Sequence, residues 1–218
     1  MRILITGASG GLGTAVVQQF LSENHTVIAV ARSWPKPPPR VITISADLTN
    51  VSDCARMAQE AGEVDTVVHV MGGFAGGKPV GETDPDVFDR MIAINLKSAF
   101  LVFRAITPQL IARGRGRLIA VGSRVGVEAV AGLSAYGVSK AGLVHLVRTL
   151  ALELKGTGVT SNIVLPSTID TAANHSAMPG ADATKWVSPE SIARVVSWLA
   201  SDAAADVNGA VIPVYGDA

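Results

Sequence analysis

The stretch Ile3-Leu4-Ile5-Thr6-Gly7-Ala8-Ser9-Gly10-Gly11-Leu12-Gly13 decides the fold of this chain. A short apolar run stops at a glycine-dense turn, after which apolar residues recur at helical spacing, at Leu12, Ala15, Val16 and Phe20. The pattern predicts a strand, a tight turn and a helix. Glycine lets the backbone approach a ligand closely, and the free N–H groups at a helix start attract an anion. A nucleotide phosphate fits this turn, although a simple tight connection would use the same glycines.

Length, charge and hydropathy narrow the class of protein. A chain of 218 residues is long enough for one sizeable core and short for two, so we expect one domain over 1–218. Lys plus Arg equals Asp plus Glu at 18 each, which gives no net field for nucleic acid or an acidic membrane. The expected partner is a small molecule. A hydrophobic content of 48% and a mean hydropathy of +0.37 predict a sheet covered on both faces.

Three further observations bear on location. No uninterrupted apolar run approaches the roughly 18 residues that a membrane span needs, so we expect no membrane segment. Met1-Arg2 leads directly into the first strand and leaves no room for a signal peptide. The single cysteine, Cys54, argues against a disulfide scaffold and a structural zinc site. We therefore expect a cytoplasmic protein without a metal site.

Apolar, β-branched runs alternate with helical patterns along the whole chain. Seven strands are predicted, near residues 3–6, 26–31, 41–45, 66–70, 117–122, 160–165 and 210–214. Helices are predicted after the glycine turn and over 51–61, 85–111, 134–154 and 190–199. This alternation is typical of an α/β protein with a doubly wound parallel sheet and right-handed crossovers. The four prolines in Ser33–Arg40 exclude a crossover helix there and predict an extended edge loop.

Three side chains in the second half of the chain are candidates for proton chemistry. Tyr136 and Lys140 stand four residues apart at the start of a predicted helix, so they share one face. A fixed positive charge there would lower the pKa of a tyrosine from its ordinary value of about 10. Ser123 lies at the carboxyl end of a predicted parallel strand, where doubly wound sheets bind ligands. Taken one at a time, these residues also have non-catalytic interpretations: Tyr136 and Lys140 as a surface pair, and Ser123 as a turn-forming residue.

Together, Thr6-Gly7-x-x-x-Gly11-x-Gly13, Ser123 and Tyr136-x-x-x-Lys140 resemble the short-chain dehydrogenase/reductase family in order and spacing. The resemblance extends from Met1 to Gly216 and implies a Rossmann fold. It implies that Tyr136 is the proton donor to a substrate carbonyl and that Ser123 hydrogen-bonds the carbonyl oxygen.

The same resemblance supplies the supporting residues of catalysis. Lys140 would lower the pKa of Tyr136, and both residues would contact the nicotinamide ribose. Asn95, in Ile94-Asn95-Leu96, matches the family asparagine that holds a water in a proton relay behind the lysine. A buried asparagine that satisfies helix backbone is compatible with that role.

Cofactor contacts carry over in the same way. The resemblance places the diphosphate on the glycine turn and the rest of the dinucleotide on segments after later strands. The implied cofactor-binding residues are Gly7, Ser9, Gly11, Leu12, Gly13, Arg32, Asp47, Leu48, Gly72, Tyr136, Lys140, Pro166, Ile169 and Thr171. Members that prefer NAD usually carry an acid after the second strand, where this chain has Ala31-Arg32. An arginine can pair with a 2′-phosphate, so we expect NADP to be preferred and NAD to be possible.

Some segments depart from the family pattern. His69-Val70-Met71-Gly72-Gly73 stands where the family usually reads Asn-Asn-Ala-Gly, and His69 is expected to be a strand histidine. The loops Gly72–Gly77 and Leu165–Thr171, with Met178 and Trp186, are similar to those of dihydropteridine reductase, a divergent member. Animal-type enzymes of that subgroup generally lack the serine seen at Ser123. Residues 172–187 are expected to form a mobile substrate lid, although a packed surface loop would have the same composition.

Three functions remain open at this level. The leading one is an NADP-preferring oxidoreductase that interconverts a small carbonyl and an alcohol; the alternatives are a pteridine reductase and a catalytically silent dinucleotide sensor. The predicted helices at 96–113 and 134–154 carry broad apolar surfaces, with Phe100, Leu101, Phe103, Leu143, Leu146, Val147 and Leu150. Family members commonly pair these helices, which implies a homodimer or homotetramer, unless the surfaces only cover the sheet.

Overall fold

A seven-stranded parallel sheet forms the centre of the computed structural model, which describes residues 1–34 and 38–217. The strands are β1 Arg2–Thr6, β2 Thr26–Ala31, β3 Ile42–Ser45, β4 Thr66–His69, β5 Gly116–Val121, β6 Val159–Pro166 and β7 Val211–Val214. Their spatial order is β3-β2-β1-β4-β5-β6-β7. The chain builds the sheet outward from β1 in one direction to β3 and then in the other direction from β4 to β7. In such sheets, ligands bind in the crevice beyond the carboxyl ends of the two strands where the direction changes, here β1 and β4. The predicted doubly wound sheet is confirmed.

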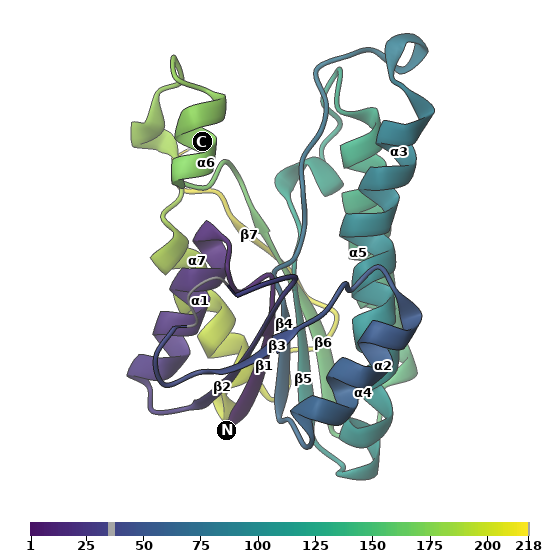
Figure 1. Ribbon diagram of the computed structural model, residues 1–218, viewed down its shortest axis with the longest axis vertical. Helices are drawn as coiled ribbons and strands as arrows, with labels where there is room; N and C mark the ends of the chain where they lie inside the picture. The colour runs from purple at the N-terminus through teal and green to yellow at the C-terminus, as the bar shows by residue number, and fades with distance from the viewer. Residues whose placement is uncertain (35–37, 218) are drawn as a thin grey trace.

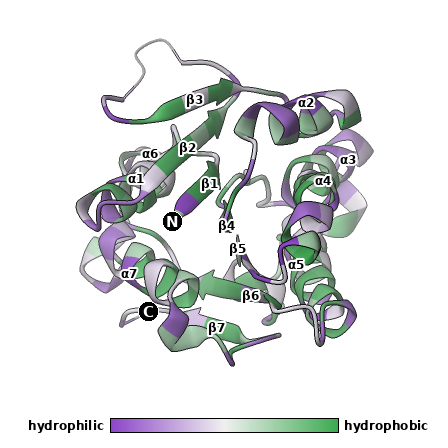
Figure 2. Cartoon of the chain, turned by 90° about the horizontal axis from the view of Figure 1, so that it is seen from below, coloured by the Kyte–Doolittle hydropathy of each residue, from purple (hydrophilic) through white to green (hydrophobic). Residues whose placement is uncertain are grey.

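Helices cover both faces of the sheet (Figures 1 and 2). The α-helices are α1 Gly11–Ser22, α2 Val51–Ala61, α3 Pro85–Ile92, α4 Ser98–Ala112, α5 Ser134–Glu153, α6 Ala172–Ala177 and α7 Pro189–Ala200. Successive strand residues point to opposite faces: Ile3 and Ile5 lie in one buried cluster with α1 and α7, and Leu4 lies in the other with α2, α4 and α5. Because both faces of the central strands are buried, these strands are mostly apolar, as the sequence predicts; Thr160, Ser161 and Asn162 of β6 are buried polar exceptions.

Local sequence signals set several helix starts. Asn50 caps α2 by accepting hydrogen bonds from the backbone N–H groups of Ser52 and Asp53. Asp84 caps α3 and Ser188 caps α7, and in both helices a proline occupies the first turn, where no N–H partner is lost. These two predicted starts agree with the structure.

Two segments differ from the expectations. The predicted helix over 85–111 is interrupted by a π-helical turn, Ala93–Lys97, between α3 and α4. The expected lid, 172–187, is not a plain loop, because it contains α6 and the short 3-10 turn Ala183–Lys185. Figure 1 shows α6 standing beyond the carboxyl edge of the sheet, across from α3.

The edge of the sheet at β3 is closed by a side chain. Trp34 donates a hydrogen bond from its indole nitrogen to the Ile44 carbonyl, at 3.1 Å, and packs against the cluster around α1. Edge strands present unpaired backbone groups, so this contact protects one of them. The middle of the predicted proline loop, residues 35–37, lies outside the described residues.

One helical stretch, Pro85–Ala112, is long and apolar enough to cross a membrane by length and composition alone. Such a stretch is weak evidence, since core helices of soluble proteins pass the same test. Val102, Ile106 and Leu110 of this stretch are fully buried in the core between the helices and the sheet. Packing against the sheet therefore accounts for its apolar character.

Candidate active site

The glycine turn between β1 and α1 is built from close backbone approaches. Gly7 has a φ of 66°, a region that favours glycine, and a β-carbon there would lie 2.7 Å from the Met71 backbone. A β-carbon on Gly13 would lie 2.1 Å from the Gly7 carbonyl oxygen. Gly10 caps α1 without a side-chain hydrogen bond. The first amides of α1 are thus left free of side-chain partners, as an anion site requires.

A cavity of about 740 Å³ opens above this turn, at the carboxyl ends of the strands. Most of the predicted cofactor residues line it: Gly7, Ser9, Gly11, Leu12, Gly13, Arg32, Asp47, Leu48, Gly72 and Thr171. Arg90 of α3 also lines the cavity and was not predicted. Arg90 stands four residues before Ile94, which also lines the cavity, but only the packing of α3 against the site shows that this helix face points into it.

Asp47 is held in one orientation at the rim of the cavity. Its Oδ1 accepts hydrogen bonds from the Thr49 amide at 3.0 Å and the Thr49 hydroxyl at 2.7 Å. Its own amide donates to Asp53 Oδ2 at 2.7 Å. The bonds from Thr49, with a smaller effect of the Arg32 charge, keep the pKa of Asp47 below its usual range. The carboxylate is therefore ionised and directed at neutral pH.

Ser123, Tyr136 and Lys140 come together beside the carboxyl end of β5. Ser123 directly follows that strand and caps a short 3-10 turn, whereas Tyr136 and Lys140 lie in the first turns of α5. Ser123 and Tyr136 share a side-chain hydrogen bond. The Lys140 ammonium lies 5.9 Å from the centre of the Tyr136 ring and donates to the Val121 carbonyl at 3.2 Å. The three predicted residues thus form one group.

The electrostatics of this group differ from the sequence-based expectation. Burial raises the pKa of Tyr136, and the hydrogen bond with Ser123 offsets part of that effect. The Lys140 charge is not among the causes of this pKa shift, so the expected lowering by Lys140 is not found. Burial also lowers the pKa of Lys140 to about 8, since an ammonium is poorly stabilised away from water. Lys140 still carries its charge at neutral pH.

Asn95 connects the cavity to this group. Its side chain donates to the Gly73 carbonyl at 3.0 Å and to Ser139 Oγ at 3.0 Å, and it accepts from the Gly73 amide at 2.8 Å. Ser139 in turn donates to the Tyr136 carbonyl at 2.7 Å. Asn95 lies in the π-helical turn, a deviation often found at functional sites. Its side chain is therefore used structurally; the expected water-holding role remains a prediction.

Gly72 marks the junction between the cavity and the proton-transfer group. A β-carbon on Gly72 would lie 2.9 Å from Asn95 Oδ1 and 3.2 Å from Lys140 Nζ. A residue without a side chain at this position lets Asn95 Oδ1 and Lys140 Nζ lie close to the backbone at the cavity wall.

His69 ends β4 as a fully buried, neutral residue. The Ser98 hydroxyl donates to the Ile94 carbonyl at 2.7 Å, so the contact at 3.3 Å between Ser98 Oγ and His69 Nε2 needs a proton on Nε2. Nδ1 then accepts from the Thr6 hydroxyl at 2.9 Å. Burial, with the nearby Lys140 charge, lowers the pKa of His69 to about 3. The expected strand histidine thus ties β1 to α4.

The segment after β6 reaches over the glycine turn. Pro166 is the last residue of β6, and Ile169 forms a parallel bridge with Val187, so neither lines the cavity described above. Thr171 caps α6 by accepting from the Asn174 amide at 3.3 Å. A β-carbon on Gly11 would lie 3.0 Å from Thr171 Cγ2. The base of the expected lid is thus packed against the start of α1.

The donors and the shape of this site fit a nicotinamide dinucleotide. The glycine cradle presents free amides, Asp47 offers a fixed acceptor, and Arg32 offers a cation beside it. Among residues 1–34 and 38–217, no group of three or more His, Cys, Asp or Glu side chains could hold a metal ion. The fold and the site together define a dinucleotide-dependent oxidoreductase.

The family is shown by comparison with known proteins. The model of the short chain dehydrogenase family matches residues 1–182. The chain therefore belongs to the short-chain dehydrogenase family, whose members are NAD(P)-dependent oxidoreductases.

Curated relatives and a solved structure agree with this assignment. The chain is 32% identical to 3-oxoacyl-(acyl-carrier-protein) reductase MabA of Mycobacterium bovis, over 98% of this chain and 91% of the relative. It is 28% identical to acetoacetyl-CoA reductase of Allochromatium vinosum, over 98% of this chain and 96% of the relative. A short-chain dehydrogenase/reductase from Burkholderia thailandensis superposes with a TM-score of 0.89 at 31% identity, covering 99% of this chain and 91% of that one.

Proposed function

We propose that this protein is an NADPH-preferring reductase that interconverts a small carbonyl compound and its alcohol. The observation that carries the proposal is the convergence of Ser123, Tyr136 and Lys140 at the carboxyl edge of the sheet, joined through Gly72 to a dinucleotide-sized cavity. The proposed site acts within one domain over 1–218, with residues 172–187 as its substrate lid.

The chemistry divides between the cofactor and the chain. When bound, NADPH supplies the hydride that adds to the carbonyl carbon. Tyr136 gives its phenolic proton to the carbonyl oxygen, so the products are an alcohol and a tyrosinate. Ser123 donates a hydrogen bond to the same oxygen, and the charged Lys140 stabilises the tyrosinate as it forms. The raised pKa of Tyr136 keeps its proton in place until the substrate binds.

The preference for NADPH rests on the end of β2. Ala31 carries no carboxylate to repel a 2′-phosphate, and Arg32 lies in the same cavity with a guanidinium suited to phosphate. Asp47 and Leu48 follow β3 on the cavity wall and are proposed to hold the adenine ring. Arg32 is exposed, so a bound phosphate would give it a partner.

Substrates with a carbonyl next to a short carbon chain are the first to test. The relatives described above are named for reduction of 3-oxoacyl and acetoacetyl groups, which are 3-oxo thioesters. His175 of the lid contacts Asp170, just before the lid, at 2.6 Å, and its ring centre lies 4.8 Å from that of Trp186. This contact ties the two ends of the lid together and would let it move as a unit.

The proposal is tested with NADPH deuterated at the transferring position. The panel contains ethyl acetoacetate, acetoacetyl-CoA, a vicinal diketone and quinonoid dihydropterin. We expect NADPH oxidation with at least one carbonyl compound and deuterium on the carbinol carbon of its product. Oxidation with the dihydropterin alone would favour the pteridine-reductase alternative. Tight NADPH binding without turnover of any compound would contradict the proposal and favour a dinucleotide sensor.

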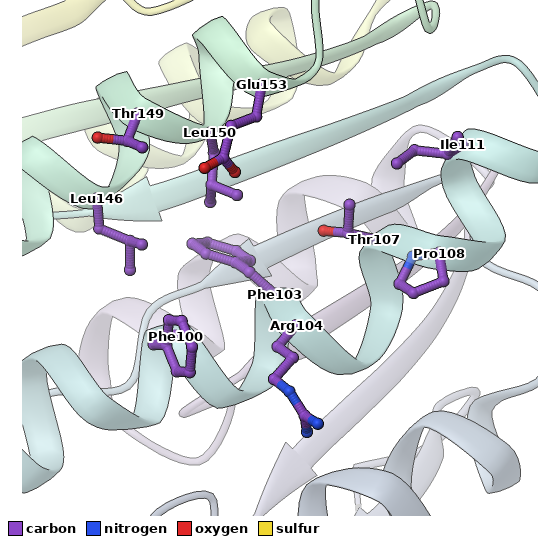
Figure 3. A pocket seen from close by; sticks show the side chains of 10 residues that line it. All are labelled: Phe100, Phe103, Arg104, Thr107, Pro108, Ile111, Leu146, Thr149, Leu150 and Glu153. Carbon is purple, nitrogen blue, oxygen red and sulfur yellow. The ribbon is translucent and has the colours of Figure 1, made fainter.

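We also propose that the protein forms a homodimer or homotetramer through α4 and α5. A groove of about 680 Å³ runs between these helices on the side away from the sheet. Figure 3 shows Phe100 and Phe103 of α4 facing Leu146 and Leu150 of α5 across it. Phe100 is 49% exposed, an unusual state for a phenylalanine in an apolar groove. A second copy of the same groove would cover it.

A cytoplasmic location completes the proposal. Cys54, the single cysteine of the chain, is buried and free. Its pKa is raised by burial to about 11, so it is an unreactive packing residue. Disulfide formation plays no part in the proposed function, as is usual in a reducing compartment.

A further inference from the structure

An exposed aromatic ring stands beside the proposed proton donor. Phe74 lies in the glycine-rich loop Gly72–Gly77 after β4, and 66% of its surface is exposed. Its ring centre is 5.1 Å from the centre of the Tyr136 ring, and the planes meet at 71°. This edge-to-face contact is a favourable geometry for two aromatic rings. The greater part of the Phe74 ring nevertheless remains open.

The loop holds this ring in a fixed place. At one end, both backbone groups of Gly73 are bonded to the Asn95 side chain, at 2.8 and 3.0 Å. At the other end, the Gly77 amide donates to the Gly132 carbonyl at 2.8 Å, just before α5. The loop is therefore anchored to the same two elements that carry Asn95 and Tyr136.

The glycines of the loop make that close packing possible. A β-carbon on Gly73 would lie 2.4 Å from Ile94 Cδ1, and one on Gly76 would lie 2.3 Å from Leu133 Cδ2. Larger residues at these positions would have to displace the Ile94 and Leu133 side chains, and a β-carbon on Gly76 would also lie 3.1 Å from the Gly132 carbonyl oxygen. The sequence thus leaves one large side chain, Phe74, in a loop otherwise composed of glycine and Ala75.

The position of the ring relates it to the reacting carbonyl. A carbonyl oxygen that accepts the Tyr136 proton lies about 2.7 Å from the phenolic oxygen. The Phe74 ring lies edge-to-face against the Tyr136 ring, so it stands beside the residue that would receive the carbonyl. An apolar substituent directed toward Phe74 would remove its open face from water, which is favourable.

We propose that Phe74 binds the apolar substituent of the carbonyl substrate and makes the enzyme prefer ketones with a flat or bulky apolar group over compact ones. The inference rests on the proposed function, because it takes Tyr136 as the proton donor. It adds a residue outside the sequence motifs and defines the substrate as apolar on one side of its carbonyl.

Two esters that differ in one group test the inference. Ethyl benzoylacetate carries a phenyl group where ethyl acetoacetate carries a methyl group. We expect Phe74→Ala to reduce the ratio of their kcat/KM values about tenfold, mainly through KM for the phenyl compound, and to leave KM for NADPH unchanged. Phe74→Leu should retain part of the preference. The matched control is Val80→Ala. Val80 is 74% exposed and lies in the 3-10 turn Val80–Glu82 that follows the loop, so this variant removes an exposed apolar side chain of similar kind.

Contact between the phenyl group and Phe74 can also be measured by binding, without turnover. Saturation-transfer NMR with NADP-loaded protein should show contact to the phenyl protons of ethyl benzoylacetate in wild type and in Val80→Ala, and a several-fold weaker signal in Phe74→Ala. Equal signals in wild type and Phe74→Ala, or an unchanged kcat/KM ratio, would overturn the inference. Failure of the proposed function would give a different result. The phenyl contact would still depend on Phe74, but no carbonyl compound would receive a hydride.

Discussion

The two halves of the site are built on different principles. The half at β1 and α1 is made of backbone: glycines without room for a β-carbon and helix amides without side-chain partners. The half at β5 and α5 is made of side chains, with a buried lysine and a buried asparagine around Tyr136. In the proposed function, the first half binds the diphosphate that nicotinamide dinucleotides share, whereas the second half carries out proton transfer.

This difference indicates how each half responds to change. A backbone cradle fails when atoms are added, because its shape is its function. A side-chain network fails when atoms are removed, because buried donors and acceptors are left unpaired. Phe74 and the proposed lid, residues 172–187, belong to neither half.

The largest effect is expected from Gly13→Ala in the backbone half. The new β-carbon would meet the Gly7 carbonyl, which belongs to the backbone and cannot turn aside. We expect NADPH binding to weaken by at least 100-fold and the free energy of unfolding to fall by about 3 kcal/mol. Calorimetric titration and urea unfolding measure both. Gly81→Ala is the control, because a β-carbon there meets nothing within 4 Å. Normal NADPH binding by Gly13→Ala would show that the backbone half does not depend on its close glycine contacts.

A second prediction concerns His69, which ties the backbone half at β1 to α4. Because its pKa is lowered to about 3 in the folded protein, the unfolded chain binds more protons below its ordinary pKa of 6.5. Stability should thus be complete above about pH 6.5 and decline by up to about 1.4 kcal/mol per pH unit below it. Urea unfolding at pH 7.5 and 5.0 measures this decline.

The matched variants separate His69 from other groups. His69→Asn should be less stable than wild type at pH 7.5 but lose less stability between pH 7.5 and 5.0. His145→Gln, at an exposed histidine of α5, should follow wild type at both values. The same pH dependence in His69→Asn and wild type would show that the buried histidine is not the titrating group.

A smaller effect is expected at Arg32. Removal of one guanidinium from a 2′-phosphate should raise KM for NADPH about tenfold in Arg32→Ala, equivalent to about 1.4 kcal/mol. KM for NADH should stay within a factor of two, since NADH carries no phosphate there. Arg115→Ala is the control, because Arg115 is exposed and lies at the amino end of β5, away from the cavity at the carboxyl ends of the strands. An equal rise for both cofactors would assign Arg32 to another part of the dinucleotide.

The smallest effect on the site is expected from the groove between α4 and α5. Phe100→Asp should shift the protein toward monomer in analytical ultracentrifugation, because a charge would be buried in an apolar contact. NADPH binding should change by less than twofold, as neither half of the site lies in this groove. A monomeric wild type would refute the proposed assembly.

Sequence reasoning predicted the framework well because the framework follows from local patterns. The β-branched runs at Thr26–Ala31 and Thr66–His69 are strands, and Asp84-Pro85 and Ser188-Pro189 start helices as expected. Most of the cavity-lining residues were implied by the family resemblance, and they lie together because parallel strands bring their carboxyl ends to one edge.

What the sequence did not predict depends on contacts between distant segments. The ring contact of Phe74 with Tyr136 joins residues 62 positions apart, and Arg90 enters the cavity through the packing of α3. The net pKa shift of Tyr136 depends on how deeply the fold buries it, which spacing to Lys140 does not reveal. The π-helical turn at Ala93–Lys97 likewise has no signal in the hydrophobic period.

The separation of binding from chemistry is tested most directly on Tyr136→Phe. Calorimetric titration with NADPH and steady-state reduction of a substrate from the panel are measured on the same preparation. We predict a Kd for NADPH within about tenfold of wild type, because at most one hydrogen bond to the ribose is lost, and a kcat/KM at least 100-fold lower, because the proton donor is lost while the cradle is intact. Undiminished turnover, or loss of NADPH binding together with turnover, would contradict the account.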